Sequence, residues 1–148
     1  MSPPPDPPET APNPPPLTQA LQRVGDRWKL AVVAVLLDGP RRFGEIATAV
    51  DGIAPNVLTQ RLRQLEQAGL VLAVPYSERP PRFLYELTPA GHDLAGVLRL
   101  LADWGVRHAG GDPLRHASCG TPLEARWYCP TCHEPADDAG SVDQLYYA

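Results

Sequence analysis

Apolar residues recur at helical spacing from residue 43 to residue 69, in two runs separated by a break. In the first run Phe43, Ile46, Ala47 and Val50 form one stripe, which predicts a helix beginning near Phe43. Asp51-Gly52 ends it. A second helix is predicted from Pro55, a residue favoured in the first turn, to Gly69, a residue suited to the left-handed position after a helix. Its buried stripe is formed by leucines at 58, 62 and 65.

The second helix has a polar face opposite its leucine stripe. Positions three and four residues apart lie on one side of a helix, so several hydrogen-bonding side chains are expected to point outward together. Forked amide and guanidinium ends of this kind match the edges of DNA bases. The predicted base-contacting residues are Asn56, Thr59, Gln60 and Arg63.

The pattern changes after Gly69 to two β-prone runs, residues 70–76 and 83–87, which predict a hairpin. Its expected tip, residues 77–82, contains two prolines and the cations Arg79 and Arg82, which suit phosphate or minor-groove contacts. Arg41 and Arg42, ahead of the first helix, are predicted to join them. Helix, turn, helix and hairpin in this order predict an α+β fold, a winged helix-turn-helix DNA-binding domain. The alternative is a helical hairpin on a small sheet with a merely solvated polar face.

Helices are also predicted on both sides of this segment. Asp26 is a plausible N-cap for a helix whose inward face comprises Trp28, Val32, Val35 and Leu36. Downstream, an apolar stripe is expected to exceed what the small domain covers, which predicts flanking dimerisation helices and a homodimer. Packing of the stripe on the chain's own domain is the alternative. The stripe consists of Leu94, Val97, Leu98, Leu101 and Trp104, and Leu17 and Leu21 begin a second such surface.

Charge is distributed unevenly along the 148 residues, whose net charge is −4. Residues 25–92 hold eight Arg or Lys and seven Asp or Glu side chains, whereas residues 93–148 hold four and eight. We expect Arg61, like the other arginines of the winged segment, to lie near the DNA-contacting edges. A near-neutral domain predicts a modest electrostatic contribution and a need for dimeric binding.

The ends of the chain differ in composition from its middle. Nine prolines in residues 1–16 predict a disordered tail, and residues 137–148 are expected to form a flexible one. Residues 17–110 would form the winged domain with its dimerisation helices. We find no signal peptide and no apolar run long enough to span a membrane, so a cytoplasmic protein is expected.

All three cysteines fall within residues 119–132, in a pattern typical of a zinc site. His116-Ala-Ser-Cys119 and Cys129-Pro-Thr-Cys132 are two chelating pairs, each with two intervening residues. The predicted ligands are therefore His116, Cys119, Cys129 and Cys132, with His133 as a competitor for the fourth position. Residues 111–136 would form a small zinc-binding appendage whose order depends on the metal, since structural zinc contributes about 10–16 kcal/mol.

Other interpretations of the cysteines remain open. They are a disulfide between Cys129 and Cys132 with one free thiol, buried thiols without metal, and a redox or metal sensor that responds through oxidation of zinc-bound thiolates. A set of three cysteines and one histidine leaves no open coordination position, and no HxE motif is present. We therefore expect no enzyme.

Several motifs in the middle of the chain, from Gly25-Asp-Arg-Trp28 to Tyr85-Glu-Leu-Thr-Pro-Ala-Gly91, resemble those of the HxlR-type regulators of the MarR-like winged-helix class. The resemblance implies a bacterial homodimeric transcription factor that binds a palindromic operator and usually represses. Two departures are Ala54, where the family often has a capping serine, and the lack of a cysteine in residues 17–24, through which some members sense oxidants. The matching motifs are Gly25-Asp-Arg-Trp28, residues 37–43, 57–66 and 68–71, Pro80-Pro81 and residues 85–91.

These features predict a sequence-specific, DNA-binding transcriptional regulator that acts as a homodimer on an inverted repeat, with double-stranded DNA as its partner and structural Zn²⁺ as its metal. The alternative is a protein-interaction adaptor, or a zinc- or redox-responsive sensor, that uses the winged domain and the zinc segment as docking surfaces. The residues identify no effector.

Overall fold

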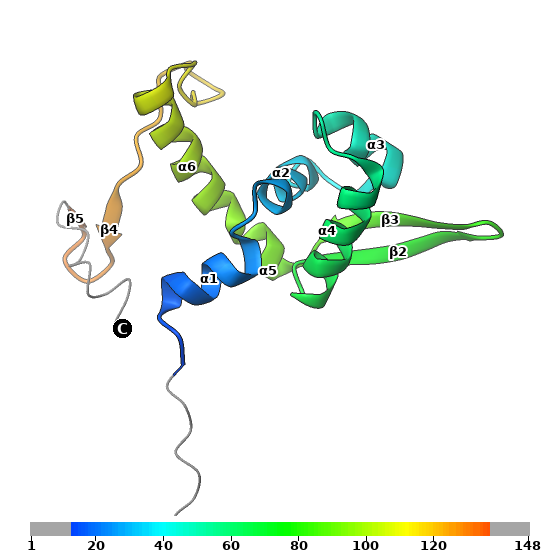
Figure 1. Ribbon diagram of the computed structural model, residues 1–148. Coiled ribbons are helices and arrows are strands. Elements are labelled where there is room, and N and C mark those ends of the chain that lie inside the picture. The colour runs from blue at the N-terminus through cyan, green and yellow to red at the C-terminus, as the bar shows by residue number, and fades with distance from the viewer. Residues whose placement is uncertain (1–12, 137–148) are drawn as a thin grey trace, which may run out of the picture.

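A computed structural model describes residues 13–136 and contains a winged helix-turn-helix domain followed by a small cysteine-rich segment (Figure 1). The predicted α+β fold is confirmed. Residues 1–12 and 137–148, to which the predicted tails mostly belong, lie outside the described residues. The elements are α1 (Pro16–Val24), α2 (Arg27–Leu36), β1 (Arg41–Arg42), α3 (Phe43–Ala49), α4 (Pro55–Gln67), β2 (Val71–Glu78), β3 (Pro81–Leu87), α5 (Pro89–His92), α6 (Leu94–Ala109), β4 (Trp127–Cys129) and β5 (Glu134–Ala136).

The helix-turn-helix unit consists of α3 and α4, with the predicted limits. Helix α3 begins at Phe43, and the Glu45 carboxylate accepts a hydrogen bond of 2.7 Å from the Arg42 main-chain N–H at its start. Helix α4 has Ala54 at its N-cap, whose methyl side chain cannot accept a hydrogen bond, and Pro55 in its first turn. Gly69 has a φ of 71° after the end of α4, as predicted from its backbone freedom.

One hydrophobic core joins α2, α3, α4 and the base of the sheet. The predicted leucines of α4, at 58, 62 and 65, are at most 1% exposed. Val32 and Leu36 of α2 are also buried, whereas Trp28 and Val35 are only half-buried against this core. The fully buried members are Val32, Val33, Leu36, Ile46, Leu58, Leu62, Leu65 and Val71.

The wing is a longer hairpin than the sequence predicts. Strands β2 and β3 pair in antiparallel fashion as far as Ser77 with Arg82 and Glu78 with Pro81, so that Arg79-Pro80 alone connects them. The predicted six-residue tip was therefore wrong, because four of its residues belong to the ladder. Strand β1, which the sequence analysis missed, adds Arg41 opposite Tyr85 and gives the order β1-β3-β2.

Helix α6 projects from the winged domain and is only partly covered by it (Figure 1). Leu94 and Leu98 pack against the core, whereas Val97, Leu101 and Trp104 are 51%, 50% and 55% exposed. The predicted stripe thus divides into an inner part that packs on the chain's own domain and an outer part that this chain leaves uncovered. Within residues 13–136, every helix is too short or too polar to cross a membrane.

Candidate DNA-binding surface and cysteine-rich segment

The outward face of α4 presents three of the four predicted base-contacting side chains. Asn56, Gln60 and Arg63 are exposed. Thr59 is half-buried, and its hydroxyl donates a hydrogen bond of 2.9 Å to the Pro55 carbonyl, one turn earlier. Thr59 can therefore only accept a hydrogen bond from a base. Among the described residues, the other three side chains donate no such bond to the main chain, so their donors stay available.

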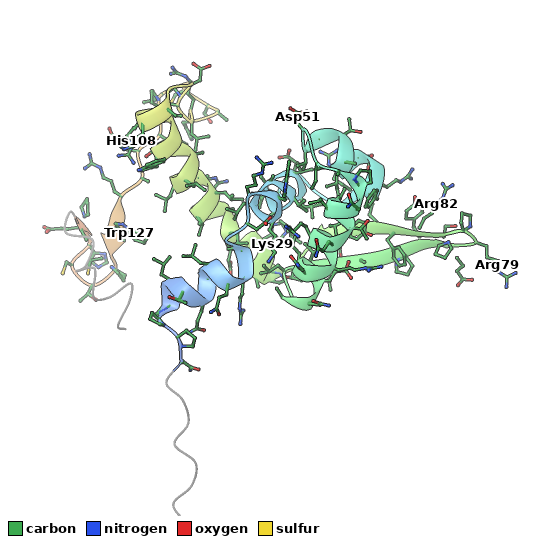
Figure 2. All side chains as sticks on the ribbon, viewed as in Figure 1. Lys29, Asp51, Arg79, Arg82, His108 and Trp127 are labelled. Atoms are coloured by element: carbon green, nitrogen blue, oxygen red, sulfur yellow. The ribbon has the colours of Figure 1, made fainter. Side chains whose placement is uncertain are left out.

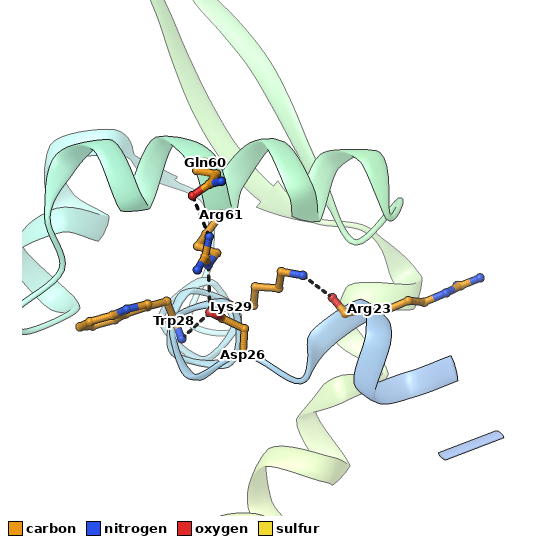
Figure 3. Close-up of polar contacts among 6 residues, drawn as sticks. All are labelled: Arg23, Asp26, Trp28, Lys29, Gln60 and Arg61. Carbon is orange, nitrogen blue, oxygen red and sulfur yellow. Dashed lines mark hydrogen bonds and ion pairs between the residues drawn. The ribbon is translucent and has the colours of Figure 1, made fainter. Parts of the chain in front are cut away.

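Arg61 does not lie at the DNA-contacting edge, and the expectation for it was wrong. Its Nε donates to Asp26 Oδ1 at 3.0 Å, and its side chain is only 19% exposed (Figure 3). The helical step explains the difference, since a residue adjacent to Gln60 is rotated about 100° around α4 toward α2. A second nitrogen of the Arg61 guanidinium donates to the Gln60 side-chain oxygen at 2.9 Å. This bond restrains the Gln60 side chain, one of the predicted base contacts.

Asp26, at the start of α2, links this helix to α4 through Arg61. Its Oδ1 accepts from the main-chain N–H groups of Trp28 at 2.9 Å and Lys29 at 3.1 Å, which confirms the predicted N-cap (Figure 3). The Arg61 guanidinium, followed by the N–H groups of Lys29 and Trp28, holds the pKa of the Asp26 carboxyl below its ordinary value despite partial desolvation. Asp26 therefore remains ionised and fixes the position of α4 on α2.

The wing carries Arg79 and Arg82 away from the helical body. Figure 2 shows both side chains at the far end of the β2–β3 hairpin, and both are exposed. Ser77 closes the turn by donating a hydrogen bond of 3.0 Å to the Pro80 carbonyl. The two guanidinium groups are thus held on a narrow hairpin, an arrangement that suits contact with phosphates or with a minor groove.

Arg41 and Arg42 lie in β1, at the base of the wing and at the beginning of α3. The guanidinium of Arg42 stacks over the Tyr76 ring, 4.9 Å from its centroid. Arg42 and Tyr76 line an open hollow of about 890 Å³ between α3 and the wing, together with Tyr85. Arg42 is exposed and Arg41 half-buried, so Arg42 is the freer cation of the two.

The pKa of Tyr85, on β3, is affected by charged residues in the second half of α4. Burial raises the pKa of the Tyr85 phenol, the Glu66 carboxylate raises it further, and the Arg63 guanidinium opposes the shift. The charges of α4 therefore lie close enough to be felt by a side chain of β3.

The cysteine-rich segment brings each predicted metal-binding pair together. His116 Nδ1 lies 3.3 Å from Cys119 Sγ, and Gly120 takes a φ of 72° after the turn, a conformation that glycine adopts easily. In the second pair, the Cys132 N–H lies 3.5 Å from Cys129 Sγ. Hydrogen bonding with the side chain and main chain of Thr121 lowers the pKa of the Cys119 thiol, and the main-chain N–H groups of Cys132 and Thr131 lower the pKa of the Cys129 thiol.

The two pairs lie apart from one another. Among residues 13–136, no group of three or more His, Cys, Asp or Glu side chains is close enough to hold a metal ion. The chain between the pairs runs back beside α6 to β4 and β5 (Figure 1), where residues 123–127 line a hollow with Gly96, Leu100 and Asp103. The three cysteines are free thiols in this arrangement.

Comparison with known proteins identifies the winged domain. The HxlR-like helix-turn-helix family matches residues 23–112. An uncharacterized HTH-type transcriptional regulator of Mycobacterium tuberculosis is 40% identical over 121 residues, which cover 78% of this chain and 76% of the relative. The HTH-type transcriptional regulator YtcD of Bacillus subtilis is 35% identical over 88 residues, which cover 60% of this chain and 70% of that protein.

Solved structures agree. A proposed transcription factor from Pseudomonas aeruginosa has a TM-score of 0.62 at 34% identity, covering 88% of this chain and 97% of its own. The reduced form of the transcriptional regulator YodB from B. subtilis has a TM-score of 0.55 at 33% identity, covering 64% and 94%. The chain therefore belongs to the HxlR-like helix-turn-helix family, and it is a DNA-binding transcriptional regulator and not an enzyme.

Proposed function

We propose that this regulator binds an inverted-repeat operator as a homodimer in the cytoplasm and represses transcription from the promoter that the operator overlaps. The observation that carries the proposal is the division of the α6 stripe. Its outer half, Val97, Leu101 and Trp104, is about half exposed in a single chain, while its inner half packs on the core. In a two-fold interface, the same stripe of a second copy would cover these exposed side chains.

Helix α1 contributes a second exposed apolar side chain. Leu21 is 57% exposed on a helix that begins at Pro16, ahead of the winged domain. Because α1 and α6 flank the recognition helix in the sequence and leave α4 free, pairing through them keeps both recognition helices accessible. Two such helices lie roughly 34 Å apart, about one DNA turn, when a dimer reads two half-sites in successive major grooves.

Within each half-site, α4 and the wing would contact different parts of the DNA. Asn56, Gln60 and Arg63 would contact base edges in the major groove, with Thr59 as an acceptor. Arg79 and Arg82 would hold phosphate or enter the minor groove, and Arg42, beside the start of α3, would contact the backbone. Arg41 is half-buried, so it is expected to contribute its positive charge more than a direct contact with DNA.

Selection from a random DNA library tests the proposal. The full chain should enrich an inverted repeat, and a transcription assay on that repeat should show repression. Enrichment of a single half-site would overturn the dimeric arrangement. A folded protein that enriches no sequence would transfer the function to a protein-interaction adaptor.

A matched pair of variants tests the dimer separately. Leu101→Glu places a charge in the stripe and is expected to give a monomer in sedimentation analysis, because an ion is costly to bury in an apolar interface. Leu72→Glu is the control, since Leu72 is equally exposed, at 51% against 50%, but lies on the wing. A dimer that survives Leu101→Glu, or one lost in Leu72→Glu, would show that α6 is not the interface.

A further inference from the structure

Residues 114–136 contain two consecutive hairpins of the same construction. Shifting the chain by thirteen positions aligns His116 with Cys129, Cys119 with Cys132, and Pro122 with Pro135. The first hairpin runs from Leu114 to Leu123, and the second is formed by β4 and β5. The predicted metal-binding pairs therefore occupy equivalent positions in a structural repeat.

The ladders of the two hairpins agree residue by residue. Arg115 pairs with Pro122 in the first hairpin, as Tyr128 pairs with Pro135 in the second. The His116 N–H donates to the Thr121 carbonyl at 2.9 Å, and Cys129 is opposite Glu134 at the equivalent place. The relationship lies in the backbone and does not depend on the side chains at the two turns.

The turns agree as well. The Gly120 N–H donates to the His116 carbonyl at 2.8 Å, and the His133 N–H donates to the Cys129 carbonyl at 2.9 Å. Each turn ends in a left-handed residue, Gly120 with a φ of 72° and His133 with a φ of 57°. A non-glycine residue adopts this conformation rarely, so the second turn keeps its shape at a cost in backbone energy.

We propose that the two hairpins bind one zinc ion between them, each turn contributing two ligands: His116 and Cys119 from the first, Cys129 and Cys132 from the second. Two tight turns, each with two ligands separated by two residues, supply the four donors of a closed tetrahedral site. The site is structural and independent of the DNA contacts on α4 and the wing. Binding displaces the protons of the three thiols.

The repeat also indicates which of the two histidines is the fourth zinc ligand. His133 is equivalent to Gly120, the residue that ends the turn, whereas His116 is equivalent to Cys129, a ligand. The Nδ1 of His133 is moreover engaged at 2.9 Å with the Tyr128 hydroxyl, within its own hairpin. His116 is thus the fourth ligand, and His133 shapes and braces the second turn.

Closure of the site requires one hairpin to move toward the other by bending of the short segment that joins them. Glu124, Ala125 and Arg126 are the three residues between the hairpins, and they are exposed. In the structure the two turns lie apart, with Leu123 and Trp127 beside α6 and 48% and 63% exposed. Such shallow contacts hold the segment weakly, so metal coordination can swing one hairpin onto the other without disturbing either ladder.

Metal titration of the full chain tests the site. Chelator-treated protein titrated with zinc should bind one ion per chain, and cobalt(II) should give the absorption of tetrahedral coordination with strong sulfur-to-metal charge transfer. A protein that binds less than half an equivalent, or a cobalt spectrum without charge transfer, would overturn the proposal.

Single variants test the ligand set. His116→Ala, Cys119→Ser and Cys129→Ser should each weaken zinc binding by more than the 10–100-fold typical of losing an outer-shell partner. His133→Ala is the matched control and should keep the cobalt spectrum of the parent. Loss of binding in His133→Ala with full binding in His116→Ala would overturn the assignment made from the repeat.

Mixed chains decide whether one chain supplies all four ligands. A double variant lacking His116 and Cys119 is refolded together with one lacking Cys129 and Cys132. Because the proposed site belongs to a single chain, the mixture should bind no more zinc than the separate variants. Recovery of about one ion per pair of chains would overturn that arrangement in favour of a site shared between two copies.

Discussion

Arg61 on α4 lies 3.0 Å from the Asp26 carboxylate at the start of α2. The same oxygen caps α2 through two main-chain N–H groups, so one carboxylate orders the first turn of one helix and positions another. The pair is only partly exposed, at 19% and 30% for the two side chains. The orientation of the outward face of α4, where we predict the base contacts, therefore depends on a residue at the start of α2.

Removal of this carboxylate should lower the free energy of unfolding. Asp26→Ala loses both the cap and the ion pair, and we expect a loss of about 1–2 kcal/mol in urea unfolding. Asp26→Asn keeps a capping oxygen and should cost less. In a double-mutant cycle with Arg61→Met, the coupling should be about 0.5–1 kcal/mol. Arg63→Met, on the exposed face, is the control and should change stability by no more than roughly 0.5 kcal/mol.

Acid should abolish the contribution of the ion pair. The pKa of Asp26 is lower in the folded protein than its ordinary value of 3.8, so its contribution to stability is fully present above that pH. It is lost as the pH falls from 3.8 through the folded-state pKa. The stability difference between the parent and Asp26→Asn, measured by urea unfolding from pH 6 downward, should be constant at first and shrink below about pH 4. A difference that grows on acidification would contradict the assignment.

The helix and the wing should respond differently to substitution when DNA binding is measured. Gln60→Ala and Arg63→Ala should each cost about 1–3 kcal/mol on the selected operator and relax preference at one base position. Arg79→Ala and Arg82→Ala should weaken operator and random DNA alike, and each should reduce the salt slope by about one. Equal loss of base discrimination in both groups would mean that the wing reads sequence.

Gly91 should not tolerate a side chain. A Cβ at this position would collide with the Leu70 carbonyl oxygen, where the chain leaves α4 and where α5 packs against it. Gly91→Ala is expected to cost about 1–3 kcal/mol through overpacking against backbone. Gly96→Ala is the matched control, because Gly96 lies in α6 with open space around it. There alanine should stabilise the protein by roughly 0.5–1 kcal/mol, as it does in helix interiors. Thermal unfolding of both variants measures the difference.

Much of the winged domain could be predicted from local sequence. The period of the leucines at 58, 62 and 65 predicted α4 and its buried face, and that face determined which polar side chains point outward. Pro55 and Gly69 predicted the ends of this helix, since proline lacks a donor and glycine tolerates positive φ. Asp26 predicted the start of α2 for a similarly local reason, namely its carboxylate beside free N–H groups.

Other features depend on groups that are distant in the sequence. The pairing of Arg61 with Asp26 joins residues 35 positions apart, so helical spacing can separate Arg61 from the outward face of α4 but cannot identify its partner. The same holds for β1, whose two arginines become a strand only because β3 offers a free edge. In the repeat of residues 114–136, matching residues recur thirteen positions apart in the sequence. The equivalence of the two hairpins is shown only by their matching strand pairing.

The sequence by itself determined where the two helices of the helix-turn-helix unit begin and end, and which of their faces are apolar, because capping, turn formation and periodic burial act over a few residues. The tertiary structure decided which residue binds Arg61, how far the wing extends and which half of the α6 stripe stays uncovered. Those outcomes depend on contacts between segments far apart in the chain, and such contacts exist only once the core has assembled around Leu58, Leu62 and Leu65.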